Sequence, residues 1–229
     1  MKSLTKHIPN TLTMLNLCSG GIACVFALER DYRMAMLFIV IGAVFDFFDG
    51  MSARLLKVSS PIGKELDSLA DDISFGLAPS LIVFSLLGEM TGGAEGVMRY
   101  LPYTAFIMAA FSGLRLAKFN LDERQSESFI GLPTPANALL WSSLAVGSHD
   151  FVMSLHPFII FVGIVFFSWL LVAEIPMFSL KFKSLAWRKN RVRYLFLIVS
   201  LCLLAAFRLA GLSAVIVWYI LLSLLTSRR

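Results

Sequence analysis

Four aspartates dominate the chemistry that this sequence can support. Asp46 and Asp49 stand before a stretch of small residues and Asp67 and Asp71 after it, with the spacing D-x2-D-G-x2-A-R-x8-G-x3-D-x3-D. An aspartate near the centre of a membrane helix costs roughly 2.5–3.5 kcal/mol on insertion scales. Because all four lie beside apolar segments, they need a compensating partner. Carboxylate oxygens are hard ligands that suit Mg²⁺ or Mn²⁺, so the spacing predicts a divalent metal site.

Two helices are expected to hold these carboxylates and turn them toward each other. On the first helix, five residues recur at i, i+3, i+4, i+7 and i+8 and so share one face: Asp46, Asp49, Gly50, Ala53 and Arg54. After a break that contains Pro61, the second helix carries three residues on one face: Gly63, Asp67 and Asp71. Antiparallel packing of the two faces predicts a carboxylate-rich pocket with Arg54 at its rim. The small residues leave room for a ligand to approach the backbone.

The composition indicates an integral membrane protein. The 229 residues are 58% hydrophobic with a mean hydropathy of +0.78, and only 15% are charged, against roughly 25% in soluble domains. We therefore expect an all-α fold, a polytopic transmembrane helix bundle that forms a single domain over residues 1–229. The formal net charge of +5 does not indicate nucleic acid as a partner, since aromatic and basic residues are not interleaved.

Eight apolar stretches are expected to form membrane spans, each of which needs about 20 residues. They lie at 9–29, 33–55, 64–88, 98–118, 134–149, 155–175, 191–209 and 211–226. The fifth and the eighth are the weakest, and six spans is the alternative. With eight spans, sixteen of the twenty Lys and Arg residues fall on the side of both termini. The positive-inside rule then predicts that both termini and the acidic pocket face the cytoplasm.

The aspartate spacing resembles the signature of the CDP-alcohol phosphatidyltransferase family, with no fixed position missing. The resemblance implies transfer of a phosphatidyl group from CDP-diacylglycerol to a small alcohol, with CMP as the leaving group. It implies that Asp46, Asp49 and Asp67 hold Mg²⁺ or Mn²⁺. Asp71 would be the general base and share in a second metal ion.

The same resemblance assigns the nucleotide end of the lipid substrate to six residues of the motif: Asp46, Asp49, Gly50, Ala53, Arg54 and Gly63. The small residues would let the cytidine diphosphate approach closely, and Arg54 would contact its phosphates. Asp72 points about 100° away from Asp71 on a helix. We therefore expect Asp72 to stay outside the site.

A second polar stretch, SGLRLAKFNLDERQSESFIGLPTPAN at 112–137, suggests the acceptor. Arg115 and Lys118 fall on the last turns of the fourth expected span, where cations also suit a helix C-terminus. GLRLAKFN followed by GLPTPANA resembles the branch of the family whose acceptor is L-serine. On that basis Arg115 or Lys118 would bind the serine carboxylate, and Asn120 its polar end. Glycerol 3-phosphate or inositol phosphate remains the alternative acceptor.

Several wider expectations follow. Asn16, Ser19 and Gly20 recur along the first span, either as a close helix–helix contact or as part of the polar pocket. The family resemblance implies a homodimer, and the site is expected to face the cytoplasm from a bacterial inner membrane. An ion-coupled transporter is the competing class, since aspartates in membrane helices can mark an ion path. Clustering of the acidic groups at one membrane face argues against it.

Overall fold

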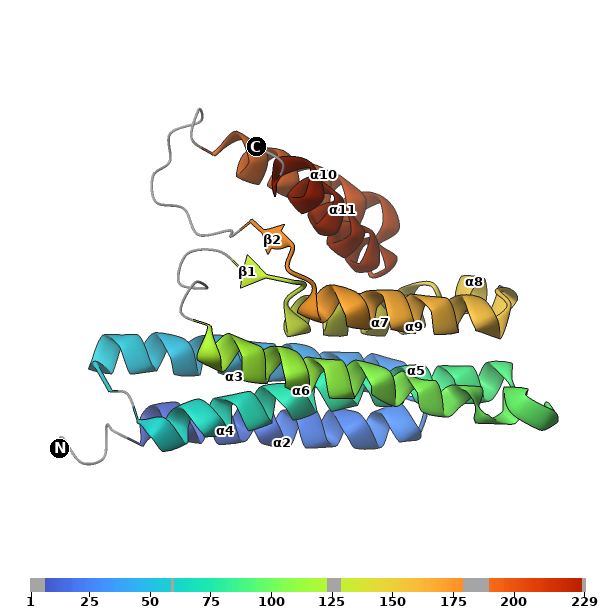
Figure 1. The fold of residues 1–229 in the computed structure, drawn as a ribbon, viewed down its shortest axis with the longest axis horizontal. Helices are drawn as coiled ribbons and strands as arrows, with labels where there is room; N and C mark the ends of the chain where they lie inside the picture. Colours follow the sequence, from blue (N-terminus) through green and yellow to red (C-terminus); the bar gives the residue numbers. More distant parts are fainter. Residues whose placement is uncertain (1–6, 59, 123–128, 179–189, 228–229) are drawn as a thin grey trace.

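The computed structural model describes residues 7–58, 60–122, 129–178 and 190–227 (Figure 1). These residues form helices joined by short turns, and one pair of two-residue strands. In chain order the elements are α2 (Ile8–Leu28), α3 (Tyr32–Leu56), α4 (Pro61–Asp71), η1 (Asp72–Leu77), α5 (Ala78–Met90), η2 (Gly96–Ala105), α6 (Phe106–Leu121), β1 (Phe129–Ile130), α7 (Thr134–Gly147), α8 (His149–Ser154), α9 (Pro157–Val172), β2 (Pro176–Met177), α10 (Arg191–Phe207) and α11 (Ala210–Ser227).

The helical fold expected from the sequence is confirmed, and each predicted apolar stretch contains a helix. Within the described residues, three helical stretches are long and apolar enough to cross a membrane: Ile8–Leu28, Tyr32–Leu56 and Pro61–Met90. The third runs without a break through α4, the π-helical segment η1 and α5. The chain is therefore a membrane protein. The number of helices that cross stays a prediction.

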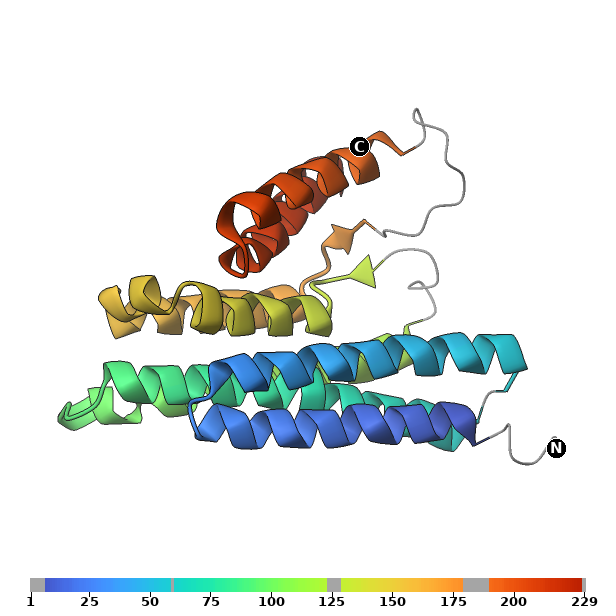
Figure 2. The same cartoon turned by 180° about the vertical axis from the view of Figure 1, so that it is seen from behind.

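The helices form two packed layers and a tilted hairpin. Figures 1 and 2 show α2, α3, α4–α5 and α6 side by side, with α7 and α9 running alongside them as a second layer and the α10–α11 hairpin beyond, at an angle. α2 packs along α3, and α11 packs on α7 and α10. Large core side chains come from five elements (α3, η1, α5, α7 and α9): Ile39, Phe75, Ile82, Leu86, Leu140 and Ile164. The start of α2 and the end of α11 lie toward the same end of the bundle (Figure 1).

The two strands are a feature that the sequence did not predict. β1 and β2 pair antiparallel, with Ile130 opposite Pro176. The next amides continue the contact, because Gly131 N donates to Ile175 O at 2.9 Å and Leu132 N donates to Leu170 O at 2.9 Å. Gly131 has φ of 76°, which only glycine adopts without strain. This pairing fixes the segment before α7 against the end of α9.

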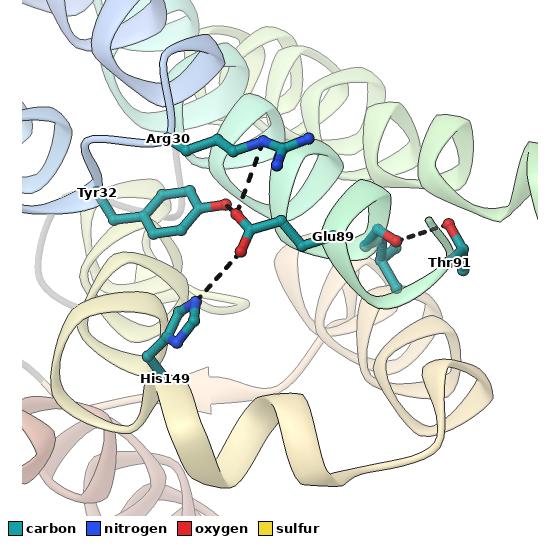
Figure 3. A network of polar contacts seen from close by, with 6 residues as sticks. Arg30, Tyr32, Glu89, Thr91 and His149 are labelled. Carbon is teal, nitrogen blue, oxygen red and sulfur yellow. Dashed lines mark hydrogen bonds and ion pairs between the residues drawn. The ribbon is translucent and has the colours of Figure 1, made fainter. Parts of the chain in front are cut away.

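At the end of the bundle where α2 turns into α3, several residues contact one carboxylate. It belongs to Glu89, near the end of α5. It accepts a hydrogen bond from the Tyr32 hydroxyl. Arg30 Nε lies 3.9 Å from Glu89 Oε1, and His149 Nε2 lies 3.5 Å from Glu89 Oε2 (Figure 3). Glu89 thus joins the α2–α3 turn, α5 and the start of α8.

Candidate active site

The turn between α3 and α4 lets the two helices that carry the aspartates pack against the same helix, α2. α3 ends at Leu56, and Lys57 then adopts a left-handed conformation with φ of 53°. The Ser60 side chain caps α4 by accepting a hydrogen bond from the Gly63 amide at 3.0 Å. Pro61 suits the first turn of α4 because it has no amide hydrogen to satisfy. Both helices then pack against α2.

The predicted convergence of carboxylates is present. Carboxylate oxygens of Asp46, Asp49 and Asp67 all lie within 4.8 Å of one another. Asp49 is 5% exposed, whereas Asp46 and Asp67 are half-buried. Asp71 lies one turn further along α4 and interacts electrostatically with all three. Asp46, Asp49 and Asp67 therefore converge, as the helical periodicity and the turn before α4 predicted.

α2 supplies the hydrogen bonds that orient two of these carboxylates. Thr13 Oγ1 donates to Asp49 Oδ2 at 2.7 Å, and Asn16 Nδ2 donates to Asp71 Oδ1 at 3.2 Å. Ser74 Oγ in turn donates to the Asn16 carbonyl oxygen at 3.0 Å. Asn16 therefore belongs to the polar pocket. Gly20 is instead a close helix contact, because a Cβ added there would meet Ser74.

The π-helical segment η1 begins directly after Asp71 and continues the helix into α5. A Cβ added at Gly76 would lie 2.7 Å from Asp72 Oδ1, and one added at Gly113 would lie 3.5 Å from it. Asp72 therefore faces α6 and lies apart from the three clustered carboxylates, as its helical angle predicted. A π-bulge often accompanies a functional site, because the extra residue changes which side chains point inward.

A cavity of about 250 Å³ opens beside the cluster. Asp49, Gly50, Ala53 and Gly63, all predicted to bind the CDP-lipid, line it. Arg54 is exposed, and its guanidinium nitrogens lie 3.9 and 4.0 Å from where a Cβ on Gly50 would be. The cavity therefore has carboxylates and glycines in its wall, and the Arg54 guanidinium lies beside Gly50.

A second cavity of about 380 Å³ lies at the end of α6. Arg115 and Lys118, the two predicted acceptor-binding cations, both line it. Arg115 is only 7% exposed, and its Nε makes no hydrogen bond with any described residue. The Arg115 guanidinium also interacts electrostatically with Asp71. Asp71 therefore interacts electrostatically both with the carboxylate cluster and with Arg115.

Asn120, the third residue predicted to bind the acceptor, does not line the second cavity and instead forms hydrogen bonds to α4. Its Nδ2 donates to Ser68 Oγ at 2.8 Å, and its carbonyl oxygen accepts from Lys64 Nζ at 2.8 Å. These two bonds tie the end of α6 to α4. Asn120 thus holds the acceptor-side helix against the helix that carries Asp67 and Asp71.

Comparison with known sequences identifies the family to which the chain belongs. The sequence profile of the CDP-alcohol phosphatidyltransferases matches residues 6–225, which is nearly the whole chain. The chain belongs to the CDP-alcohol phosphatidyltransferase family.

Curated members of the CDP-alcohol phosphatidyltransferases are similar over much of the chain. The CDP-diacylglycerol–serine O-phosphatidyltransferase of Bacillus subtilis is 34% identical over 74% of this chain and 88% of that protein. The enzyme of the same name from Mycobacterium bovis is 32% identical over 87% of this chain and 70% of that protein. The one from Helicobacter pylori is 37% identical over 58% of this chain and 54% of that protein. A phosphotransferase activity follows from the family.

The carboxylate cluster of this CDP-alcohol phosphatidyltransferase fits a divalent cation. The family is generally dependent on divalent metal. Asp46, Asp49 and Asp67 bring three hard oxygen ligands within 4.8 Å of one another. Within the described part of the chain, no Lys or Arg forms an ion pair with them. A divalent cation would offset the mutual repulsion of these carboxylates, and carboxylate oxygens are suitable ligands for one.

Two groups at the site were not found from the sequence. Thr13 carries a readable signal, because Asn10, Thr13 and Asn16 recur every third residue on an otherwise apolar helix. Glu174 carries none, since it reaches the second cavity only through the pairing of β1 with β2.

Proposed function

We propose that the chain transfers the phosphatidyl group of CDP-diacylglycerol to the hydroxyl of L-serine, giving phosphatidylserine and CMP. The observation that carries the proposal is the place of Asp71. It lies in electrostatic reach both of the carboxylate cluster and of Arg115 in the second cavity. The serine acceptor is supported by the names of the relatives from Bacillus subtilis and Mycobacterium bovis.

The first cavity suits the cytidine diphosphate end of the lipid. Gly50 and Gly63 leave its walls without side chains, so a flat ligand can lie against the backbone. Arg54, whose guanidinium lies beside Gly50, would contact the phosphates. Asp46, Asp49 and Asp67 would hold the Mg²⁺ or Mn²⁺ whose chemistry, when bound, is to neutralise and align the pyrophosphate.

Asp71 is the general base in this proposal. Its Oδ1 accepts the amide proton of Asn16, which leaves Oδ2 to take the proton of the serine hydroxyl. The serine oxygen then forms a bond to the phosphatidyl phosphorus as the bond from that phosphorus to CMP breaks. Holding the two substrates together on one protein would make this attack effectively unimolecular.

The acceptor end of the site uses the cations of α6. Arg115 is nearly buried yet lines the second cavity, so a serine carboxylate there would complete the bonding of its guanidinium. Lys118 is exposed at the same cavity and adds positive charge. Asn120 would act by fixing α6 against α4 through Ser68.

The lipid part of the substrate can stay in the bilayer during the reaction. Phe47 and Phe48 lie between Asp46 and Asp49 in the chain and are 61% and 43% exposed. The same helical turn therefore presents carboxylates inward and aromatic rings outward. Acyl chains packed against these rings would leave the diphosphate beside the cluster.

The membrane arrangement is part of the same proposal. The excess of Lys and Arg on one side supports an eight-helix, multi-pass chain with both termini and the site at the cytoplasmic face of a bacterial inner membrane. That face is where serine and CMP exchange with water. A single domain over residues 1–229 fits the helix packing, and the homodimer stays a prediction from the family resemblance.

The experiment that tests this function is a choice of acceptor. Purified protein in detergent, with CDP-diacylglycerol and Mg²⁺ or Mn²⁺, is given L-serine, glycerol 3-phosphate or inositol phosphate separately, and CMP release is measured. We expect release that depends on serine. Release only with a phosphorylated alcohol would retain the first cavity and refute the serine acceptor. No release with any acceptor, from folded protein, would refute the proposed reaction as a whole.

A further inference from the structure

The first cavity has one positively charged side chain among the described residues that line it, and that side chain belongs to Lys64. The same lining contains the carboxylates of Asp49 and Asp67. Lys64 lies in the first turn of α4, directly after Gly63, which also lines the cavity. A diphosphate beside these carboxylates adds further negative charge, so an ammonium group in the same wall would stabilise it.

A hydrogen bond to α6 fixes the position of the Lys64 ammonium group. Lys64 Nζ donates to the Asn120 carbonyl oxygen at 2.8 Å. The Asn120 side chain is itself tied to α4, because its Nδ2 donates to Ser68 Oγ at 2.8 Å. A lysine ammonium group has three N–H donors, and the bond to Asn120 uses one of them. Lys64 can therefore donate to phosphate oxygens and keep its bond to α6.

Lys64 and Arg54 come to the cavity from different helices. Arg54 belongs to α3, and its guanidinium nitrogens lie 3.9 and 4.0 Å from the place of a Cβ on Gly50. Lys64 belongs to α4 and follows Gly63. Both glycines line the cavity, and both cations are exposed. A ligand lying against the two glycines would thus have a cation from each helix within reach, and the flexible stem of lysine lets its ammonium group adjust to a phosphate.

We propose that Lys64 binds the diphosphate of CDP-diacylglycerol, from the position that its bond to the Asn120 carbonyl oxygen gives it. This inference rests on the proposed function and adds a binding residue that is not one of the fixed positions of the aspartate motif. The same bond joins the nucleotide cavity to α6, the helix that carries Arg115 and Lys118. The competing role for Lys64 is purely structural, a tie between α4 and α6, and the experiment must separate the two.

The test measures both KM values in the CMP-release assay for three variants. Lys64→Met keeps the length of the side chain and removes its charge. We expect its KM for CDP-diacylglycerol to rise roughly 10-fold, the low end for a hydrogen bond to a charged group because Lys64 is exposed, with little change in the KM for L-serine. Lys64→Arg should restore most of the affinity, because it retains a cation. Lys57→Met is the matched control, since Lys57 is exposed directly after α3 and does not line the cavity.

A purely structural role would give a different pattern of KM values. Ser68→Ala removes the bond from the Asn120 side chain and so loosens the tie between α4 and α6 without touching Lys64. Its effect should fall on the serine KM, because the acceptor cations lie on α6. A rise confined to the serine KM in Lys64→Met, or a CDP-diacylglycerol KM equal to that of Lys57→Met, would overturn the proposal. Serine-dependent CMP release from the wild type in the same assay shows that the proposed function stands even if this inference fails.

A measurement on the unaltered enzyme keeps the inference testable if a variant does not fold. Wild-type protein in detergent with Mg²⁺ is treated with an amine-acetylating reagent, alone or with CDP or cytidine, and the labelling of Lys64 and Lys57 is compared by mass spectrometry. We expect CDP to protect Lys64 severalfold and to leave Lys57 unchanged, whereas cytidine, which has no phosphates, protects neither. Equal labelling of Lys64 with and without CDP would overturn the proposal.

Discussion

The substitution Gly50→Ala separates the stability of this chain from its activity. Gly50 lies inside α3 and lines the cavity assigned to cytidine diphosphate. A Cβ added there would find only the Arg54 guanidinium nearby, at 3.9 and 4.0 Å, which is ordinary van der Waals contact. The folded chain therefore has room for the methyl group. Under the proposed function the substrate does not, because the methyl would occupy the wall assigned to the nucleotide.

The two effects have opposite signs and can be estimated. Alanine is better than glycine in a helix interior by about 0.8–1 kcal/mol, so the variant should be at least as stable as the parent. A ligand displaced by about 1 Å can lose about 100-fold in rate, which corresponds to about 2.7 kcal/mol of transition-state stabilisation. We expect kcat/KM for CDP-diacylglycerol to fall by that factor.

The assay measures CMP release and the thermal midpoint in detergent for Gly50→Ala and a matched variant, Gly21→Ala. Gly21 lies inside α2, and a Cβ there would meet nothing within 4 Å. Both variants should gain similar helix stability, and only Gly50→Ala should lose activity. If Gly50→Ala keeps the kcat/KM of Gly21→Ala, the nucleotide does not bind against Gly50. A large fall in its thermal midpoint would contradict the packing argument instead.

Four further results are expected. Asp71→Asn should lower kcat by roughly 100- to 10,000-fold, the usual contribution of a general base, with CDP-diacylglycerol binding retained; near-normal turnover would remove Asp71 from the mechanism. Asn16→Ala should lower kcat about 10-fold, because it removes the bond to Asp71 Oδ1, and a change confined to KM would contradict that role. EDTA should stop CMP release, and Mg²⁺ or Mn²⁺ should restore it; full activity in chelator would refute a metal at the Asp46 cluster. Gly131→Ala should destabilise the fold by more than about 1–2 kcal/mol, since the positive φ costs about that much and the added Cβ would also clash with the Leu171 carbonyl oxygen; an unchanged thermal midpoint would contradict this argument.

The carboxylate cluster was predictable because its geometry is local. Asp46 and Asp49 share a helix face at i and i+3, and Asp67 lies one turn before Asp71 on the next helix. Only the direction of one turn, at Ser60 and Pro61, was needed to bring the faces together. Helical periodicity and a turn signal therefore sufficed for this half of the site.

The second cavity was less predictable because distant segments form it. The i, i+3 spacing of Arg115 and Lys118 puts both on one face of α6, and both line the second cavity. Asn120 follows Lys118 by two residues and so points away from it, toward Ser68. The different directions of Lys118 and Asn120 can be read from their spacing in the sequence. The position of Glu174 at the second cavity cannot, because it depends on a strand pair between residues 129–130 and 176–177. The π-helical turn after Asp71 likewise has no local signal.

The Glu89 network in Figure 3 has a consequence for the order in which the chain is made. Two partners of Glu89, Arg30 and Tyr32, precede it in the sequence, and His149 follows it by sixty residues. A ribosome therefore delivers Arg30 and Tyr32 before the carboxylate that needs them. Glu89 can be neutralised and hydrogen-bonded as soon as α5 joins α2 and α3, without waiting for α7–α9. The contacts of Glu89 with Arg30 and Tyr32 thus let the helices that carry the four aspartates pack together first. His149 then adds to a contact that has already formed.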